Sequence, residues 1–425
     1  MERIDWMDVA QYFYITDEGL GEFSKKFTTS LEHVLAGKES SLSAVPSYMG
    51  LPTGKESGTY LALDFGGTNI RVSKIRLLGN HCFLIDKQVS KPLCLPGKYD
   101  YMARSTSANE LFDFIANLIG QVAGGNREYA LGHTFSFAVE QENVHDARLV
   151  AWSKEMAAQG VEGAYVNALL TAALKRRGLD KIKPVALLND TTAALLAAAY
   201  QHTPANIGVI CGTGFNMCYY EPTRQMILNL EAGNYDGAKR SRWDEVVDEQ
   251  SQKPGYHQLE KLISGAYLSE IYRQTVMTYY KTDDIPHFTT EDMNRIVSTE
   301  NVKDGRLIMS CLWNRIVAPE DVRPLRNIGA AIFVRSAQIC GAAVYAVLRH
   351  VYGTTSIPAQ TIAVEGSVLE HVRGGLFMME DALRASQASY GLSRTESVLA
   401  EPVIIKNGPS VGAAIAAAMV IAPRE

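Results

Sequence analysis

The N-terminal part of the chain passes from a helical to a strand-like hydrophobic pattern. In the first 45 residues apolar side chains recur at spacings of three and four, which predicts helix; they are Leu20, Phe23, Phe27, Leu31, Val34 and Leu35. Residues 60–65 (YLALDF) then form an apolar run, and residues 70–78 (IRVSKIRLL) carry β-branched side chains without a helical stripe. Both segments predict strands. The turn between them contains Gly66, Gly67 and Thr68.

A second strand–turn–strand unit follows about 150 residues later. Residues 207–211 (IGVIC) and 215–220 (FNMCYY) predict strands, and Gly212, Thr213 and Gly214 separate them. In a P-loop or a dinucleotide fingerprint the glycine turn joins a strand to a helix, whereas here it joins two strands. Two such hairpins predict a duplicated nucleotide-binding scaffold, although either one alone would be read as an unrelated hairpin.

Strands and helices alternate over the rest of the chain. Residues 184–188 (PVALL) predict a buried strand that ends at Asn189 and Asp190, and the Ala- and Leu-rich residues 191–200 predict a helix. Further helices are predicted at residues 267–280, 328–352 and 411–420. This alternation predicts an α/β fold with mixed sheets.

Composition limits the class of protein. A chain of 425 residues exceeds what one hydrophobic core usually supports, so we expect two domains. It is 47% hydrophobic and 20% charged, with a mean hydropathy of −0.06, which is typical of a packed globular protein. The 41 basic and 46 acidic residues give a net charge of −5, so we expect no nucleic-acid partner and no membrane partner.

Three further features favour a cytoplasmic protein. The apolar run 411–422 is too short to span a bilayer. The N-terminus is polar and acidic, unlike a secretory signal. The six cysteines include no CxxC pair, which argues against a disulfide framework and a zinc ribbon.

Residues 50–55 (GLPTGK) have some likeness to a phosphate-binding P-loop. The segment has one residue too few between its glycines, and Glu56 stands where a Ser or Thr would bind magnesium. We therefore interpret it as a turn.

Several stretches together resemble the hexokinase family. Residues 61–72 (LALDFGGTNIRV) resemble its first phosphate motif and residues 212–221 (GTGFNMCYYE) its second. The family's sugar-binding signature is matched at 131–137 (LGHTFSF), Gln141, 152–154 (WSK) and 189–191 (NDT). A further matching segment lies at 254–267. The resemblance implies a two-domain actin-like (ribonuclease H-like) ATPase fold, with mixed sheets flanked by helices. The small domain would span 54–188 plus 406–425, and the large domain 1–53 plus 189–405.

The resemblance also implies an activity. An ATP-dependent hexokinase would transfer the γ-phosphoryl group of ATP to the 6-hydroxyl of glucose or a similar hexose. Its cofactors would be ATP and Mg²⁺, its partners the hexose and ATP–Mg, and its assembly a monomer or a homodimer. Phosphoryl transfer to an alcohol needs a base for the hydroxyl proton. Asp190, at a strand-to-helix junction, is the candidate; for a lone Asp we would favour an N-cap, but Asn189 beside it and the family match favour catalysis.

The same resemblance assigns the sugar side of the site. Lys154 and Arg71 join Asp190 as candidate catalytic residues, Arg71 as a cation for the charge on the transferred group. We expect Glu260 to lie off a helical stripe of Leu259, Leu262, Ile263 and Ala266. At Glu231 the chain reads NLEAG where the family has NTEWG. The candidate hexose ligands are Ser136, Ser153, Lys154, Asn189, Asp190, Asn216, Glu231 and Glu260.

The nucleotide side is assigned from both phosphate motifs. Asp64 would organise magnesium through its water shell. The adenosine segment 364–368 has Glu365 where the family has Asp, and Ala138 replaces a family proline, which leaves nucleotide selectivity open. The other candidate cofactor-binding residues are Gly66, Gly67, Thr68, Asn69, Arg71, Gly212, Thr213, Gly214, Gly366 and Ser367. The basic clusters 175–177 and 239–242 are interpreted as a helix C-terminus and a solvated loop.

Three alternatives remain beside this hypothesis. A sugar kinase of the repressor and kinase group would carry a cysteine-rich zinc loop, which the sequence lacks. A catalytically silent sugar sensor would be expected to lose the base or the metal carboxylate, yet Asp64 and Asp190 are both present. An actin- or chaperone-like ATPase is disfavoured by the sugar-side Asn and Glu residues. Because the candidate hexose ligands fall on both sides of the expected domain boundary, we also expect sugar to close the two domains.

Overall fold

The computed structural model describes residues 3–153, 156–202, 204–353, 356–390 and 399–422. The chain divides into two units. Unit 1 comprises residues 1–44, 209–217 and 230–404, and unit 2 comprises residues 45–208, 218–229 and 405–425. Residues 189–208, which we had expected to open the large domain, thus belong to the same unit as the first glycine hairpin.

A five-stranded sheet forms the centre of unit 2. Its order is β10-β7-β2-β3-β4, with β2, β7 and β10 parallel and β2, β3 and β4 antiparallel. The first hairpin predicted from the sequence is confirmed as β2 and β3. The strands are β2 (Ser57–Phe65), β3 (Asn69–Gly79), β4 (Cys82–Pro92), β7 (Tyr129–Phe135) and β10 (Ile182–Leu188). Two short pairs accompany them: β5 (Cys94–Leu95) with β6 (Tyr99–Asp100), and β8 (Ala138–Gln141) with β9 (Ala147–Ala151).

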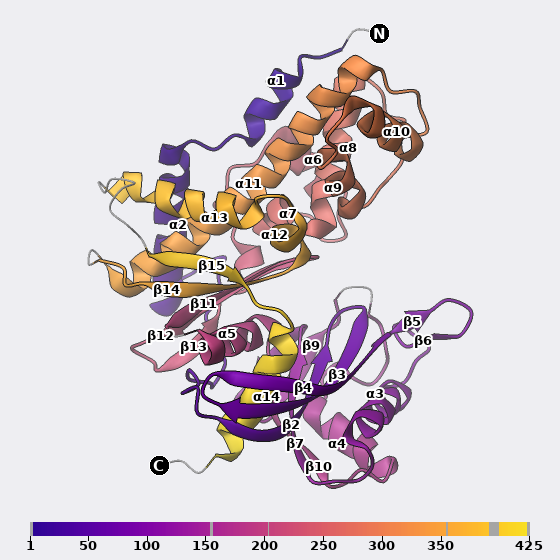
Figure 1. The fold of residues 1–425 in the computed structure, drawn as a ribbon, viewed down its shortest axis with the longest axis vertical. Coiled ribbons are helices and arrows are strands. Elements are labelled where there is room, and N and C mark those ends of the chain that lie inside the picture. The colour runs from indigo at the N-terminus through magenta and orange to yellow at the C-terminus, as the bar shows by residue number, and fades with distance from the viewer. Residues whose placement is uncertain (1–2, 154–155, 203, 354–355, 391–398, 423–425) are drawn as a thin grey trace. The chain divides into compact units, whose positions relative to one another are not determined.

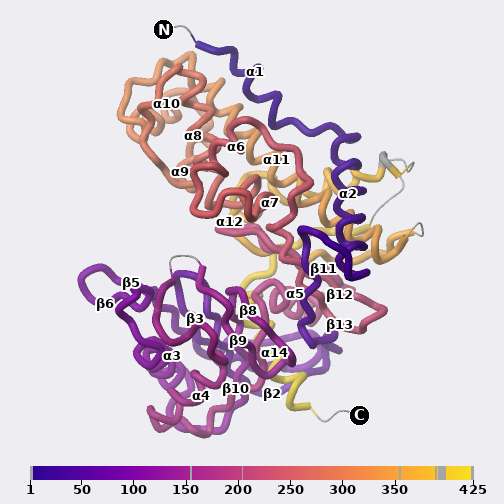
Figure 2. Tube along the Cα trace, turned by 180° about the vertical axis from the view of Figure 1, so that it is seen from behind, coloured from indigo at the N-terminus to yellow at the C-terminus, as the bar shows by residue number. Residues whose placement is uncertain are grey.

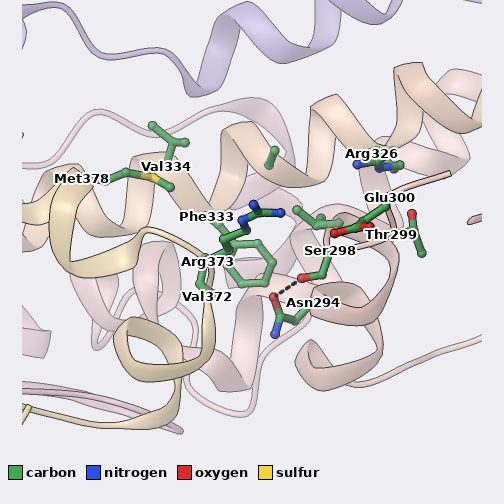
Figure 3. Close-up of a pocket in the computed structure, with 12 residues that line it drawn as sticks. Asn294, Ser298, Thr299, Glu300, Arg326, Phe333, Val334, Val372, Arg373 and Met378 are labelled. Carbon is green, nitrogen blue, oxygen red and sulfur yellow. Dashed lines mark hydrogen bonds between the residues drawn. The ribbon is translucent and has the colours of Figure 1, made fainter.

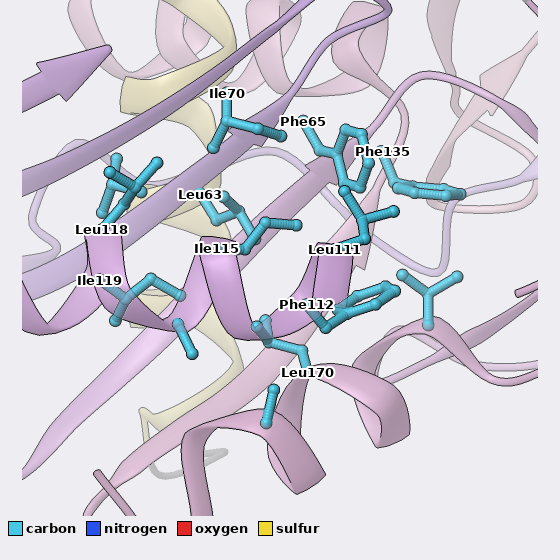
Figure 4. Packing of buried hydrophobic residues seen from close by; sticks show 14 of the residues in the cluster. Leu63, Phe65, Ile70, Leu111, Phe112, Ile115, Leu118, Ile119, Phe135 and Leu170 are labelled. Atoms are coloured by element: carbon cyan, nitrogen blue, oxygen red, sulfur yellow. The ribbon is translucent and has the colours of Figure 1, made fainter. Parts of the chain in front are cut away.

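The two faces of this sheet are covered differently. Alternate residues of β2 and β7, among them Leu63, Phe65 and Phe135, pack on α3 (Ala108–Ala123) and α4 (Val166–Arg176) in one hydrophobic cluster (Figure 4). Strand side chains alternate between faces, so Asp64 and Thr134 lie on the opposite face. Helix α14 (Gly408–Ile421) packs on this second face and also on α5 (Asp190–Gln201).

Glycine determines how closely α14 approaches its neighbours. A Cβ at Gly132 of β7 would lie 1.8 Å from the carbonyl oxygen of Ala413, and one at Gly412 would lie 1.9 Å from that of Ala193 in α5. Both positions therefore need glycine for backbone-to-backbone packing. Helix α14 is buried along almost its whole length, so the apolar C-terminal run is a core helix.

Unit 1 is mainly helical and is organised around α11 (Pro319–Tyr352), against which α1 (Trp6–Ala10), α2 (Asp17–Leu35) and α13 (Gly375–Ala385) pack (Figures 1 and 2). The predicted N-terminal helix is confirmed for α2, and α1 and a 3₁₀ turn precede it. The remaining helices are α6 (Arg242–Glu249), α7 (Gln258–Ile263), α8 (Gly265–Tyr280), α9 (Thr290–Val297), α10 (Val302–Leu312) and α12 (Ser367–His371).

Helix α11 is the one described helix whose length and hydropathy would suit a membrane span. Its most apolar 18-residue window has a mean hydropathy of 1.6, yet 83% of that window is buried inside the protein. A helix that is apolar all round and enclosed by other helices is typical of a large core.

A six-stranded sheet has the order β1-β13-β12-β11-β14-β15. The second predicted hairpin is confirmed as β11 and β12, and each of these strands contributes residues to both units. In unit 1, β14 pairs with β15 in parallel. The strands are β1 (Val45–Pro46), β11 (Ala205–Cys211), β12 (Phe215–Glu221), β13 (Met226–Asn229), β14 (Gln360–Glu365) and β15 (Ala400–Ile404).

The interpretation of residues 50–55 as a turn is confirmed. The backbone N–H groups of Thr53 and Gly54 donate to the carboxylate of Glu56 over 2.8 and 3.0 Å. The amides that a P-loop would offer to a phosphate are therefore occupied by a side chain of the same turn.

Candidate functional site

Three parallel strands of unit 2 end side by side. Asp64 of β2 is in register with Thr134 of β7, and Thr134 is in register with Leu188 of β10. Ligand sites of open α/β sheets lie at the carboxyl ends of such strands. Ser136 follows Thr134 by two residues, and Asn189 and Asp190 follow Leu188 directly. Candidate residues from three distant segments thus meet at one edge of the sheet.

Asp64 is held from two sides at this edge. The Thr134 hydroxyl donates to Asp64 Oδ1 over 3.0 Å, and the Arg71 guanidinium lies 3.6 Å from Oδ2. Arg71 is the antiparallel register partner of Asp64 on β3, so both side chains project from the same face. The Asp64 side chain is 15% exposed. It therefore keeps access to solvent while its orientation is restrained.

The first glycine turn is closed by short-range bonds. The Gly66 N–H donates to the Asn69 carbonyl over 3.1 Å, and the Asn69 amide donates to the Thr68 hydroxyl over 3.1 Å. The Leu93 N–H donates to the Thr68 carbonyl over 2.8 Å, which ties the turn to the segment after β4. Thr68 and Asn69 are exposed at its tip, where a phosphate could reach them.

Asn189 and Asp190 have different roles at the start of α5. Asn189 is the N-cap, with extended backbone angles, and its Oδ1 accepts from the Thr191 N–H over 2.8 Å. Asp190 is the first helical residue, and its Oδ1 accepts from the same N–H over 2.8 Å. The alternative in which Asp190 serves as the N-cap is therefore wrong, because its neighbour fills that position. A carboxylate in the first turn is stabilised by the helix dipole.

The second glycine turn is supported by two helix N-termini in unit 1. The Gly265 and Ala266 N–H groups at the start of α8 donate to the carbonyls of Gly212 and Thr213 over 2.7 and 3.1 Å. Gly366, before α12, has a φ of 115°, and a Cβ there would lie 2.4 Å from the carbonyl of Cys211 and 2.6 Å from the Gly212 nitrogen. Only glycine fits this close contact, which leaves Ser367 exposed beside the hairpin.

Glu260 contacts the same hairpin. Its Oε2 accepts from the Phe215 N–H over 2.9 Å, and a Cβ at Gly214 would lie 2.7 Å from that oxygen. The expected apolar stripe is confirmed for Leu259, Leu262 and Ile263, which are buried. It is wrong for Ala266, because α7 ends at Ile263 and Ala266 is exposed in α8.

Asn216 and Glu231 complete this cluster. The Asn216 Oδ1 accepts from the N–H groups of Met217 and Ala232 over 2.7 and 3.1 Å, which fixes the residue next to Glu231. Glu231 has a left-handed backbone with a φ of 45° and precedes the 3₁₀ turn Ala232–Asn234. A Cβ at Gly233 would lie 3.1 Å from the Glu260 Cβ. Unit 1 therefore brings Asn216, Glu231 and Glu260 together.

Some predicted residues are not joined to these clusters. Lys154 lies outside the described residues. Ser153 is exposed, and its carbonyl accepts from the Met156 N–H over 3.1 Å. Within the described part of the chain no hydrogen bond links Ser153 to the edge that holds Asp64 and Asp190.

The structure tests the interpretation of the two basic clusters, residues 175–177 and 239–242. Lys175 and Arg176 end α4, and Arg176 and Arg177 pair with Asp113, so the interpretation as a helix C-terminus is confirmed. The interpretation of residues 239–242 as a loop is wrong for Arg242, which begins α6.

The sequence did not indicate a cavity of about 440 Å³ in unit 1. It lies between α9, α11 and the segment after α12 and has an apolar floor around Phe333 (Figure 3). Ser298 donates to Asn294 Oδ1 over 3.3 Å at its edge. Its lining comes from residues 294–300, 326–334 and 372–378, so no local motif marks it. Thr134 was also missed, although the period of two in β7 places it on the face of Asp64.

Two glycine hairpins, one beside a strand edge with Asp64 and Asp190 and one beside Asn216 and Glu260, define a sugar kinase of the actin-like ATPase class. The chain belongs to the hexokinase family. Two family models, both described as hexokinase, match residues 5–200 and 206–419. The family resemblance and the fold class inferred from the sequence are thereby confirmed.

Named relatives and solved structures agree with this assignment. The chain is 30% identical to hexokinase-1 of Schizosaccharomyces pombe, over 85% of this chain and 80% of that protein. It is 31% identical to hexokinase-2 of Saccharomyces cerevisiae, over 99% and 92%. A crystal structure of a hexokinase matches with a TM-score of 0.86 at 28% identity, covering 98% of both chains. The glucose complex of Schistosoma mansoni hexokinase matches with a TM-score of 0.81 at 26% identity, covering 97% and 98%. The chain is accordingly an ATP-dependent hexose kinase.

Proposed function

We propose that the protein transfers the γ-phosphoryl group of ATP to the 6-hydroxyl of glucose or a similar hexose, with Asp190 as the general base. The observation that carries the proposal is the shared strand edge of Asp64, Thr134 and Leu188, which leads directly into Asn189 and Asp190. The solved glucose complex of the Schistosoma mansoni relative supports glucose as a substrate.

The base acts on the hexose hydroxyl. A hexose hydroxyl is a poor nucleophile until its proton is removed, and a carboxylate in the first turn of a helix is a fixed acceptor for that proton. Because Asn189 satisfies the cap, the second oxygen of Asp190 can serve the substrate. Arg71, and Lys154 outside the described residues, would offset the negative charge on the transferred group.

Asp64 suits a magnesium ion that arrives with the nucleotide. Mg²⁺ keeps most of its waters and is bound in kinase sites by one or two carboxylates together with substrate phosphates. A single, partly exposed carboxylate with restrained oxygens, next to the first glycine turn, fits that donor set. When bound, the ion would supply positive charge that offsets the negative charge of the phosphate groups.

The other candidates divide between phosphates and sugar. We assign Gly66, Gly67, Thr68 and Asn69 with Gly212, Thr213 and Gly214 to the phosphates, since each turn carries an exposed threonine, Thr68 or Thr213, whose hydroxyl group can donate to a phosphate oxygen. Ser367 would contact the nucleoside, whose base we assign to the cavity beyond α12. Filling that cavity with Ser298→Trp is expected to raise the nucleotide KM more than the hexose KM. The hexose hydroxyls would be bound by Ser136, Ser153, Lys154, Asn189, Asn216, Glu231 and Glu260.

We propose that the hexose closes the protein. Asn189 and Asp190 belong to unit 2, whereas Asn216, Glu231 and Glu260 belong to unit 1. A ligand that binds both sets favours a closed state and shifts the population toward it. Closure would exclude water, a rival acceptor for the γ-phosphoryl group. Small-angle scattering should show a smaller radius of gyration with glucose, and an unchanged radius at saturating glucose contradicts the proposal.

A coupled assay with a panel of hexoses against ATP, other nucleotides and pyrophosphate tests the function. Rapid phosphorylation of glucose by ATP supports it, and sugar binding without turnover would instead identify a silent sensor. We further propose a cytoplasmic location and a monomer or homodimer with no nucleic-acid or membrane partner, which cell fractionation and light scattering test.

A further inference from the structure

Thr134 places a hydroxyl group in the interior of unit 2. It is fully buried in the middle of unit 2, on the sheet face opposite the large hydrophobic cluster. Its side chain donates to Asp64 Oδ1 over 3.0 Å, and its other described contact, to the Leu63 carbonyl, is longer at 3.4 Å. Valine has nearly the same shape and no polar group to desolvate. The presence of a hydroxyl group at this position is therefore explained by its hydrogen bond to Asp64.

The contact can act on the orientation of Asp64. The terminal torsion of an aspartate is broad, so its carboxylate plane needs partners to be fixed. Thr134 is β-branched and packed in a strand, which makes its own χ1 stiff. Its parallel register with Asp64 sets the separation of the two backbones. Arg71 approaches the other oxygen at 3.6 Å from the antiparallel side. The two neighbours together define one carboxylate plane.

We propose that Thr134 is a positioning residue of the kinase, which orients the Asp64 carboxylate for the metal that accompanies the nucleotide. The proposal rests on the proposed function, in which Asp64 serves that metal. Thr134 itself touches neither sugar nor nucleotide in this scheme. It acts through a charge-assisted hydrogen bond, which is stronger than a bond between neutral groups.

The test compares Thr134→Val with Thr134→Ser by calorimetry, using ADP so that no turnover occurs. We expect Thr134→Val to weaken binding of Mg·ADP by about tenfold, the scale of one lost hydrogen bond to a charged group. Binding of ADP in EDTA and of glucose without nucleotide should change less than about twofold, because neither needs Asp64. Thr134→Ser retains the donor and should restore most of the Mg·ADP affinity.

Thr275→Val is the matched control. Thr275 is also fully buried, but its hydroxyl donates to the Tyr272 carbonyl within α8 of unit 1. The Thr275→Val substitution should lower the melting temperature without a specific loss of Mg·ADP binding. Equal weakening of Mg·ADP, metal-free ADP and glucose by Thr134→Val would show a merely structural role and overturn the proposal. Unchanged Mg·ADP affinity in a folded Thr134→Val protein would also overturn it.

Asp64→Asn separates this proposal from the function on which it rests. If Asp64→Asn lowers Mg·ADP affinity and Thr134→Val does not, the metal role of Asp64 stands and the positioning role fails. If neither substitution changes Mg·ADP affinity, the assignment of Asp64 to the metal is itself wrong.

Discussion

The backbone N–H of Phe215 donates to Oε2 of Glu260 over 2.9 Å, so the strand that follows the second glycine turn fixes a carboxylate carried by α7. The helix is also held from behind. The buried Arg335 guanidinium donates to the Leu262 carbonyl over 3.1 Å, and the Ser336 hydroxyl donates to the Ile263 carbonyl over 2.7 Å. Glu260 thus has little freedom to move away from a ligand.

Glu260→Gln is expected to raise the hexose KM by about tenfold or more while the nucleotide KM changes little. The amide can still accept from the Phe215 N–H, but it loses the negative charge and one acceptor for sugar hydroxyls, a loss of about 1–3 kcal/mol. Titration of both substrates measures the effect. Glu249→Gln, at an exposed position on α6, is the control. An effect confined to ATP would assign Glu260 to the nucleotide.

Asp190→Ala is expected to lower kcat by at least about 10²-fold while glucose binding stays measurable. Because Asn189 supplies the cap, the substitution should cost little stability. Single-turnover kinetics and calorimetry with glucose test both parts. Near-normal turnover in the folded variant would remove Asp190 as the base.

Asn189→Ala is the complementary variant. It should destabilise the protein by about 1 kcal/mol through loss of the N-cap, which Asp190→Ala should not. Urea unfolding of the two variants measures the difference.

The sequence predicted the local parts of the site better than their assembly. Both hairpins and the junction at residues 188–191 follow from runs of β-branched and Ala-rich residues. The N-cap was harder, because Asn189 and Asp190 are both good capping residues and only backbone angles distinguish them. The parallel pairing of Asp64 with Thr134 joins residues 70 positions apart. No local period encodes that register.

Unit boundaries were harder still to predict. Helix α5 was included in the expected large domain, because the second segment of that domain began at residue 189. In the structure it packs on α14 through the contact of Gly412 with Ala193, and both helices belong to unit 2. An Ala-rich helix has no sequence feature that identifies its partner, since many small surfaces would fit it equally well.

Gly366→Ala is expected to weaken nucleotide binding strongly and to lower the melting temperature, with glucose binding spared. Its φ of 115° disfavours any side chain, and the new methyl group would meet the Cys211 carbonyl at 2.4 Å. The second glycine turn would have to move.

Gly37→Ala is the matched control, since Gly37 also has a positive φ but no atom lies within 4 Å of its Cβ position. Calorimetry with ADP compares the two variants. Equal effects of both would show that backbone strain alone matters.

His133 makes the stability of unit 2 sensitive to acid. Burial lowers the pKa of His133 to about 4, and its hydrogen bond to Asn167 offsets this only in part. The ordinary value is about 6.5. Between these values the unfolded chain binds a proton that the folded protein excludes, so stability falls as the pH drops from about 6.5 to about 4.

The size of this effect follows from the same two pKa values. Between pH 7 and pH 5 the wild-type protein should lose about 2 kcal/mol more than a His133→Gln variant, which has no proton to bind. Urea unfolding at both pH values measures the free energy of unfolding of each protein. Because each protein is compared with itself at the two pH values, any lower stability of the variant at pH 7 cancels. If His133→Gln loses as much stability on acidification as the wild type, the buried imidazole is not the source.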